Sequence, residues 1–193
     1  SSLDPAGRRD LVRRTIGDEG NPDKATLETV GELKRGDLTI RKMVLHSEIP
    51  LPGLSFVPAK PDGRVIVYLH GGSMKADAGP GGAIEQLARS GAVVHAVELR
   101  GIGETETGNR RKAFGAGRFG RDNLENWIEA LGIESAGLIG IGEAAIPALH
   151  VAALKPKSFA TVTLRGMIPS WESLAGSPET HDQMVNLVQG VLR

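Results

Sequence analysis

Short apolar segments alternate with helical patterns along the chain from residue 64 onward. Residues 65–69, Val-Ile-Val-Tyr-Leu, form a continuous apolar run, which is typical of a strand buried on both faces of a parallel sheet. Strands that alternate with helices of this length indicate right-handed βαβ units. The sequence therefore predicts an α/β protein with a mostly parallel sheet of about six strands and helices on both faces. The other predicted strands in this part are 92–99, 136–141 and 159–164, and the predicted helices are 83–90, 122–131, 143–154 and 177–191.

The first 63 residues carry weaker patterns. Asp4 and Pro5 have the residue types of a helix start, and Gly17 would end that helix. Residues 18–36 are polar and predict a loop or linker, and two short strands follow at 38–46 and 53–57 around a Pro-Leu-Pro-Gly turn. We therefore expect an N-terminal helical arm and linker over residues 1–36 and a core domain over residues 37–193.

Composition excludes several classes of protein. The 193 residues are 40% hydrophobic and 24% charged, which is typical of a folded globular chain and not of a disordered one. The 23 basic and 23 acidic residues balance, so neither a nucleic acid nor an anionic membrane is expected as a charge-driven partner. Cysteine is absent, which excludes disulfides and thiolate chemistry. The compartment stays open between cytoplasmic and secreted.

Glycine-rich segments follow three of the predicted strands, where α/β sheets bind their ligands. The first is His70-Gly71-Gly72-Ser73. Glycines directly after a buried strand expose backbone N–H groups to a ligand, so this segment predicts an oxyanion hole. The alternative is a simple glycine turn before a helix.

The second glycine-rich segment contains Arg100 and Glu104. These two side chains are candidates for a clamp on a polar substrate. The alternative is a structural ion pair between them that shapes the loop.

The third segment, 140–144, lies between a predicted strand and a predicted helix, which is the setting of a nucleophile elbow. Gly140 and Ala144 satisfy the two small positions, but the nucleophile position holds Gly142, which has no side chain. Moving the frame to make Glu143 the nucleophile would place Ile141 at a small position, so we reject it. The sequence predicts a degenerate elbow and no intact catalytic set.

Taken in order, the segments 65–72, 100–105 and 140–154 resemble the α/β-hydrolase superfamily, and more narrowly its acetyl xylan esterase and dienelactone-hydrolase-like branch. The resemblance covers most of residues 38–193. It implies ester hydrolysis by a Ser–acid–His triad. This chain departs at Gly142, and it ends one predicted helix after the fourth strand, before the family's acid and histidine. None of the histidines matches the family's catalytic one by position: His46, His70, His95, His150 and His181.

The resemblance therefore implies a truncated protein of carboxylic or carbohydrate ester hydrolase lineage that is inactive as this chain. The alternative is a non-catalytic ligand-binding or structural module. A minor alternative is a dinucleotide-binding domain, because residues 140–145 fit G-x-G-x-x-A. No pair of residues has metal-ligand spacing, and we expect neither a metal nor another cofactor.

The expected ligand is a small ester or sugar-like molecule. We also expect a homo-oligomer joined through the C-terminal half, because the strand 159–164 would be an open edge of the sheet.

Overall fold

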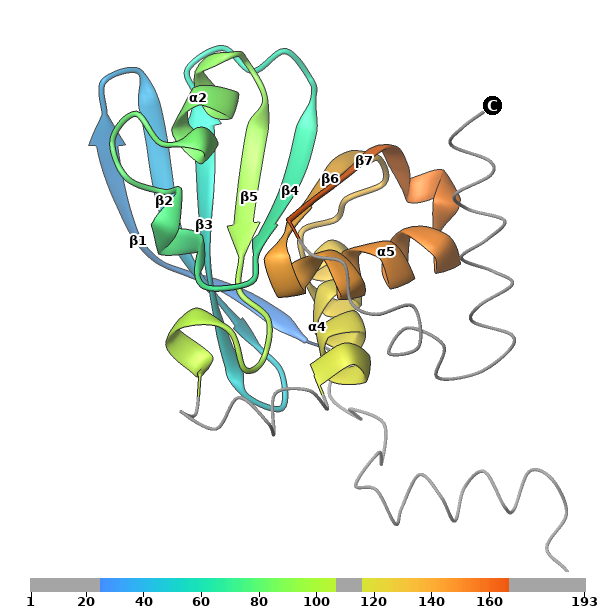
Figure 1. Ribbon diagram of the computed structural model, residues 1–193. Helices are drawn as coiled ribbons and strands as arrows, with labels where there is room; N and C mark the ends of the chain where they lie inside the picture. The colour runs from blue at the N-terminus through green and yellow to red at the C-terminus, as the bar shows by residue number, and fades with distance from the viewer. Residues whose placement is uncertain (1–24, 107–115, 167–193) are drawn as a thin grey trace, which may run out of the picture.

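The computed structural model describes residues 25–106 and 116–166, and these residues fold around one mixed sheet (Figure 1). The sheet has seven strands in the order β1-β2-β3-β5-β4-β6-β7. The α/β class is confirmed, with helices packed on both faces of the sheet. The strands are β1 (Thr26–Arg35), β2 (Leu38–His46), β3 (Pro50–Pro58), β4 (Val65–His70), β5 (Val93–Val97), β6 (Ala136–Ile141) and β7 (Phe159–Arg165).

The sheet has an antiparallel half and a parallel half. Strands β1, β2, β3 and β5 pair antiparallel in turn, whereas β5, β4, β6 and β7 pair parallel. The four strands predicted from residue 64 onward are therefore the four strands of the parallel half. They are joined by helical connections, as the alternating pattern predicts.

The N-terminal part differs from the prediction in two places. Residues 26–35 form β1, so the prediction of a loop there is wrong. β1 is an edge strand with most of its residues exposed, and it therefore lacks the apolar alternation of a half-buried strand. The second strand of the pair begins at Pro50, so the Pro-Leu-Pro-Gly segment lies inside β3 and the turn is at 47–49. The helical arm predicted before residue 18 lies outside the described residues.

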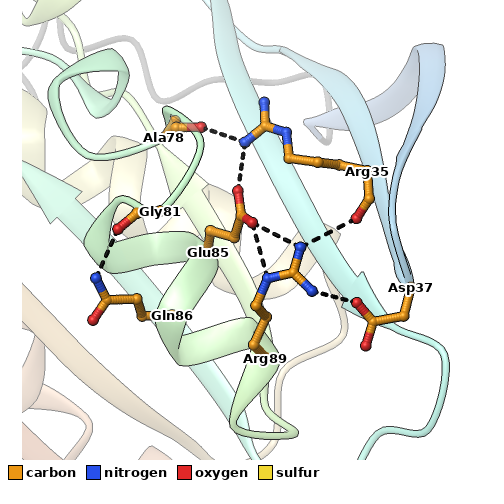
Figure 2. Close-up of polar contacts among 7 residues, drawn as sticks. All are labelled: Arg35, Asp37, Ala78, Gly81, Glu85, Gln86 and Arg89. Atoms are coloured by element: carbon orange, nitrogen blue, oxygen red, sulfur yellow. Dashed lines mark hydrogen bonds and ion pairs between the residues drawn. The ribbon is translucent and has the colours of Figure 1, made fainter.

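An ion-pair network joins the β1–β2 hairpin to helix α2 (Ala83–Arg89), as Figure 2 shows. The Glu85 carboxylate is buried at its centre. It accepts hydrogen bonds from Arg35 Nη1 at 2.8 Å and from Arg89 Nε at 2.9 Å. Arg89 also pairs with Asp37 in the hairpin turn. The pKa of Glu85 lies below its usual range because Arg35 and Arg89 both donate to its charged form. Strand β1 precedes the domain boundary that we expected after residue 36, and this network joins it to the core.

Helices cover the two faces of the sheet unequally. Helix α2 packs on one face over a cluster that contains Phe56 and Tyr68. Helices α4 (Ala116–Ala130) and α5 (Ala145–Leu154) pack on the other face, where Trp127 is fully buried. The helix predicted to start at Asp122 begins six residues earlier, so Asp122 lies inside α4 and is not its cap.

The remaining helical elements are short turns at strand ends: η1 (Met74–Ala76), η2 (Gly103–Thr105), η3 (Gly142–Ala144) and η4 (Pro156–Ser158). The helix predicted at 177–191 lies outside the described residues. Within the described part of the chain, every helix is too short or too polar to cross a lipid bilayer.

Candidate functional site

The turns that follow β4 and β6 lie against each other at the carboxyl ends of these strands. The two strands are adjacent and parallel, and His70 pairs with Ile141 at their ends. The Gly71 N–H then donates to the Ile141 carbonyl at 2.7 Å. A Cβ on Gly71 would lie 2.5 Å from the Glu143 nitrogen, so only glycine allows this close approach. Two of the three glycine-rich segments that the sequence singled out, the first and the third, are therefore together, as expected from parallel neighbouring strands.

The turn after β6 has the shape of a nucleophile elbow. Gly142 has a φ of +62°, and the chain passes through η3 directly into α5. Gly140 lies under this helix, because a Cβ there would be 2.9 Å from both Ala145 Cα and Ala148 Cβ. A strand, a left-handed residue at the tip and a helix packed on a small residue are the parts of such an elbow. The tip of the turn is Gly142, which offers no side-chain atom.

The alternative frame, with Glu143 as the nucleophile, does not fit this turn. In that frame Glu143 would be the left-handed residue at the tip, but no described residue other than glycine has a positive φ, and the left-handed residue of this turn is Gly142. The elbow also accounts for the glycines of the G-x-G-x-x-A match. This leaves the dinucleotide-binding interpretation without structural support.

The candidate oxyanion donors are engaged within the protein. Gly71 N–H is used by Ile141, and the N–H groups of Gly72 and Ser73 donate to His70 Nδ1 at 3.0 and 3.2 Å. The expectation that this segment presents free donors is therefore wrong for this conformation, because the His70 ring turns back over its own loop. A role of His70, Gly71, Gly72 and Ser73 in holding an oxyanion stays a prediction.

The other side of the His70 ring faces an acidic group. Nε2 of His70 lies 3.9 Å from Asp77 Oδ2, and the same oxygen accepts a hydrogen bond from the Tyr68 hydroxyl at 2.7 Å. Burial and the bond to Asp77 raise the pKa of Tyr68, so its hydroxyl stays protonated as the donor.

A buried carboxylate that the sequence analysis did not single out holds the loops beside the site. Glu98, at the end of β5, is 1% exposed. Its Oε1 accepts from Ser73 Oγ at 2.7 Å and from the Met74 N–H at 3.2 Å, and its Oε2 accepts from the Glu104 N–H at 2.8 Å. The sequence carried a signal for this role, because Glu98 stands between the apolar residues Val97 and Leu99, and a buried charge must be paired or hydrogen-bonded.

Arg100 and Glu104 do not pair with each other. Arg100 Nη1 lies 2.8 Å from Glu48 Oε2, and Glu104 Oε1 lies 2.8 Å from Lys75 Nζ. The alternative of an ion pair between the two is therefore wrong, because each pairs with a different residue. Their role as a substrate clamp is untested.

The other histidines lie away from the two turns. His95 is within β5, and burial lowers its pKa to about 4. His150 is on α5, and burial, followed by the charge of Arg121, lowers its pKa. His46 is exposed on β2 and pairs with Glu28. His181 lies outside the described residues. Within residues 25–106 and 116–166, no cluster of three or more histidine, aspartate or glutamate side chains could hold a metal ion.

A family model described as the alpha/beta hydrolase fold matches residues 64–192. The chain belongs to the α/β hydrolase fold family. This match covers about two thirds of the chain, including the four parallel strands and both glycine-rich turns. The finer resemblance, to the acetyl xylan esterase branch, remains a proposal.

Solved structures share the α/β hydrolase fold with this chain at low sequence identity. A cold-adapted esterase from an Arctic intertidal metagenomic library is 18% identical with a TM-score of 0.55, covering 81% of this chain and 72% of that one. A putative acetyl xylan esterase from Bacteroides fragilis is 13% identical with a TM-score of 0.53, covering 79% and 51%. A probable hydrolytic enzyme from Pseudomonas aeruginosa is 22% identical with a TM-score of 0.50, covering 83% and 47%.

This chain thus spans about half the length of two of these three α/β hydrolase-fold proteins. The comparison with curated proteins found no match.

Proposed function

We propose that this chain is an α/β-hydrolase-fold protein of carboxylic or carbohydrate ester hydrolase lineage that does not itself hydrolyse esters. The observation that carries the proposal is Gly142 at the tip of the elbow, with a φ of +62°. Covalent ester hydrolysis in this fold requires an attacking side chain at that tip, next to a general base. Glycine cannot supply one.

The hydroxyl of Ser73, in the turn after β4, does not replace the absent nucleophile. Ser73 Oγ donates to Glu98 Oε1 and accepts a hydrogen bond from the Lys75 N–H, so its proton and a lone pair are both engaged in local structure. His70, the histidine beside the elbow, uses Nδ1 as an acceptor for its own loop. Neither side chain is arranged as a nucleophile and base.

In place of turnover, we propose that a small ester or sugar-like ligand binds at the carboxyl ends of β4 and β6, over the two turns. The support is the preserved elbow geometry, with Gly71 packed against the Glu143 nitrogen, at the sheet edge where α/β proteins bind ligands. Two of the structural neighbours, a cold-adapted esterase and a putative acetyl xylan esterase, favour this ligand class over others.

Turnover of short-chain aryl esters tests the proposal. We expect no hydrolysis above the buffer rate by the wild type, and none by Gly142→Ser, because no base among residues 25–106 and 116–166 is placed to activate a new hydroxyl. Ser73→Ala is the matched control. Turnover by the wild type that is lost in Ser73→Ala would overturn the proposal. Turnover by Gly142→Ser alone would show that a histidine reaches the elbow and that the loss of the nucleophile is the single defect.

A further inference from the structure

The His70 imidazole covers two backbone donors of its own loop. Its Nδ1 accepts hydrogen bonds from the N–H groups of Gly72, at 3.0 Å, and Ser73, at 3.2 Å. The ring packs directly on Gly72, since a Cβ on that glycine would lie 3.4 Å from His70 Cε1. A ring nitrogen accepts only when it carries no proton, so this arrangement requires a neutral imidazole with its hydrogen on Nε2.

Asp77 stands on the Nε2 side of the same ring. Its Oδ2 lies 3.9 Å from Nε2 and is held in place by the Tyr68 hydroxyl at 2.7 Å. A carboxylate near Nε2 favours the hydrogen on that nitrogen and leaves Nδ1 as the acceptor. The His70 side chain is 25% exposed, so protons from solvent reach it.

A proton added at Nδ1 would point an N–H toward two backbone N–H groups. Donors cannot pair with donors, so both hydrogen bonds would break, while the imidazolium would be attracted to Asp77. We propose that His70 is a pH-dependent latch that occupies the Gly72 and Ser73 amides when it is neutral and releases them to an anionic ligand group when it is protonated. The ligand group that binds the released amides would be a carboxylate.

The charges around the ring act on this latch with different signs. Asp77 attracts the imidazolium across 3.9 Å, whereas the Glu98 carboxylate is engaged by Ser73 Oγ, the Met74 N–H and the Glu104 N–H. Arg165 carries the opposite charge two strands away in the same register row, since His70 pairs with Ile141 and Ile141 pairs with Arg165. Lys75, which lies on η1 between Ser73 and Asp77, pairs with Glu104 at 2.8 Å. On β4 and in the turn after β6, Tyr68 is protonated and Glu143 is exposed.

The ligand part of this inference rests on the ligand binding proposed above, but the latch does not. The latch predicts a change in two amides of the free protein, which is measured without any ester. A failure of the latch would therefore leave the proposal of a non-hydrolytic protein untouched, and ester turnover would leave the latch untouched.

NMR of the isotope-labelled chain between about pH 8 and pH 5, where histidine titrates, provides the test. We expect the Gly72 and Ser73 amide resonances to shift with the same midpoint as the His70 ring nitrogens. In His70→Gln these amide shifts should become independent of pH, whereas the exposed His46→Gln control should keep them. The co-titration in the wild type is itself a test, should the His70→Gln variant fail to fold.

Acetate serves as the anionic probe. We expect acetate to perturb the Gly72 and Ser73 amides with an affinity about tenfold or more higher at pH 5.5 than at pH 8, because only the released loop is competent to bind. Amides that stay constant while His70 titrates would overturn the latch, as would the same pH dependence in His70→Gln. Equal acetate affinity at both pH values would overturn the ligand-releasing role.

Discussion

Replacing Glu98 by glutamine tests whether one buried carboxylate holds the loops on both sides of the site. The change keeps the shape of the side chain but turns one acceptor oxygen into an NH2 donor. The remaining oxygen can still accept from Ser73 Oγ and the Met74 N–H, whereas the new NH2 group faces the Glu104 N–H, which Oε2 accepts at 2.8 Å in the wild type.

The expected cost follows from these contacts. Losing a hydrogen bond to a charged group costs about 1.5–3 kcal/mol, and a buried donor left unpaired costs about 1–3 kcal/mol. Part of this is offset, because the amide no longer carries the desolvation cost of a buried charge. We expect the free energy of unfolding to fall by about 2–3 kcal/mol, and the Tm by about 5–10 °C for a chain of this size.

Urea and thermal unfolding of Glu98→Gln measure this effect, with Glu48→Gln as a separate control variant. Glu48 makes a 2.8 Å ion pair with Arg100 at the surface, with 48% of its side chain exposed. The same chemical change there should cost less than about 1 kcal/mol. A Glu98→Gln variant within about 0.5 kcal/mol of the wild type would refute the reasoning, since ordinary surface changes fall in that range.

Three further changes test other parts of the account. Gly71→Ala should destabilise the fold and shift the Glu143 and Ala144 amide resonances, because its Cβ would lie 2.5 Å from the Glu143 nitrogen; unchanged resonances would contradict the close packing of the two turns. Glu85→Gln should lower the free energy of unfolding at neutral pH, because Arg35 and Arg89 stabilise the charged Glu85 and lower its pKa. The difference in free energy from the wild type should vanish as acid protonates Glu85, and a difference that persists in acid would contradict the prediction. In the wild type, the free energy of unfolding should fall by at most about 3 kcal/mol as the pH falls from 6.5 toward 4, because His95 takes up a proton more readily in the unfolded chain than in the folded one. His95→Gln should remove this loss. Parallel pH curves for the variant and the wild type would contradict the prediction.

The sequence predicted well those elements whose two faces are both buried. Strand β6 was predicted at its observed bounds, because Ala136–Ile141 is an apolar run between turn signals. Strand β1 was missed because an exposed edge strand carries no apolar alternation, and Pro50 was taken as a turn residue although it lies in β3. Pro50 pairs with His46 of β2, and this pairing is seen only in the register of the two strands.

The candidate site was predictable in its backbone and not in its side chains. The meeting of Gly71 with the elbow followed from adjacent parallel strands, which is a property of topology. The ring position of His70 depends on Asp77 and on the loop's own N–H groups, and no sequence pattern encodes that choice. Arg100 likewise pairs with Glu48, which is 52 residues away in the sequence, and not with the nearby Glu104.

Intact-mass spectrometry after incubation with a fluorophosphonate probe tests the central claim most directly. The probe forms a stable adduct with an activated serine, so it reports the nucleophile without knowledge of the substrate. Because Gly142 lies at the tip of the elbow, we expect no adduct and hence an unchanged mass for this chain, under conditions that label an active serine esterase completely. A stoichiometric adduct on a single serine, lost when that serine is replaced by alanine, would contradict it.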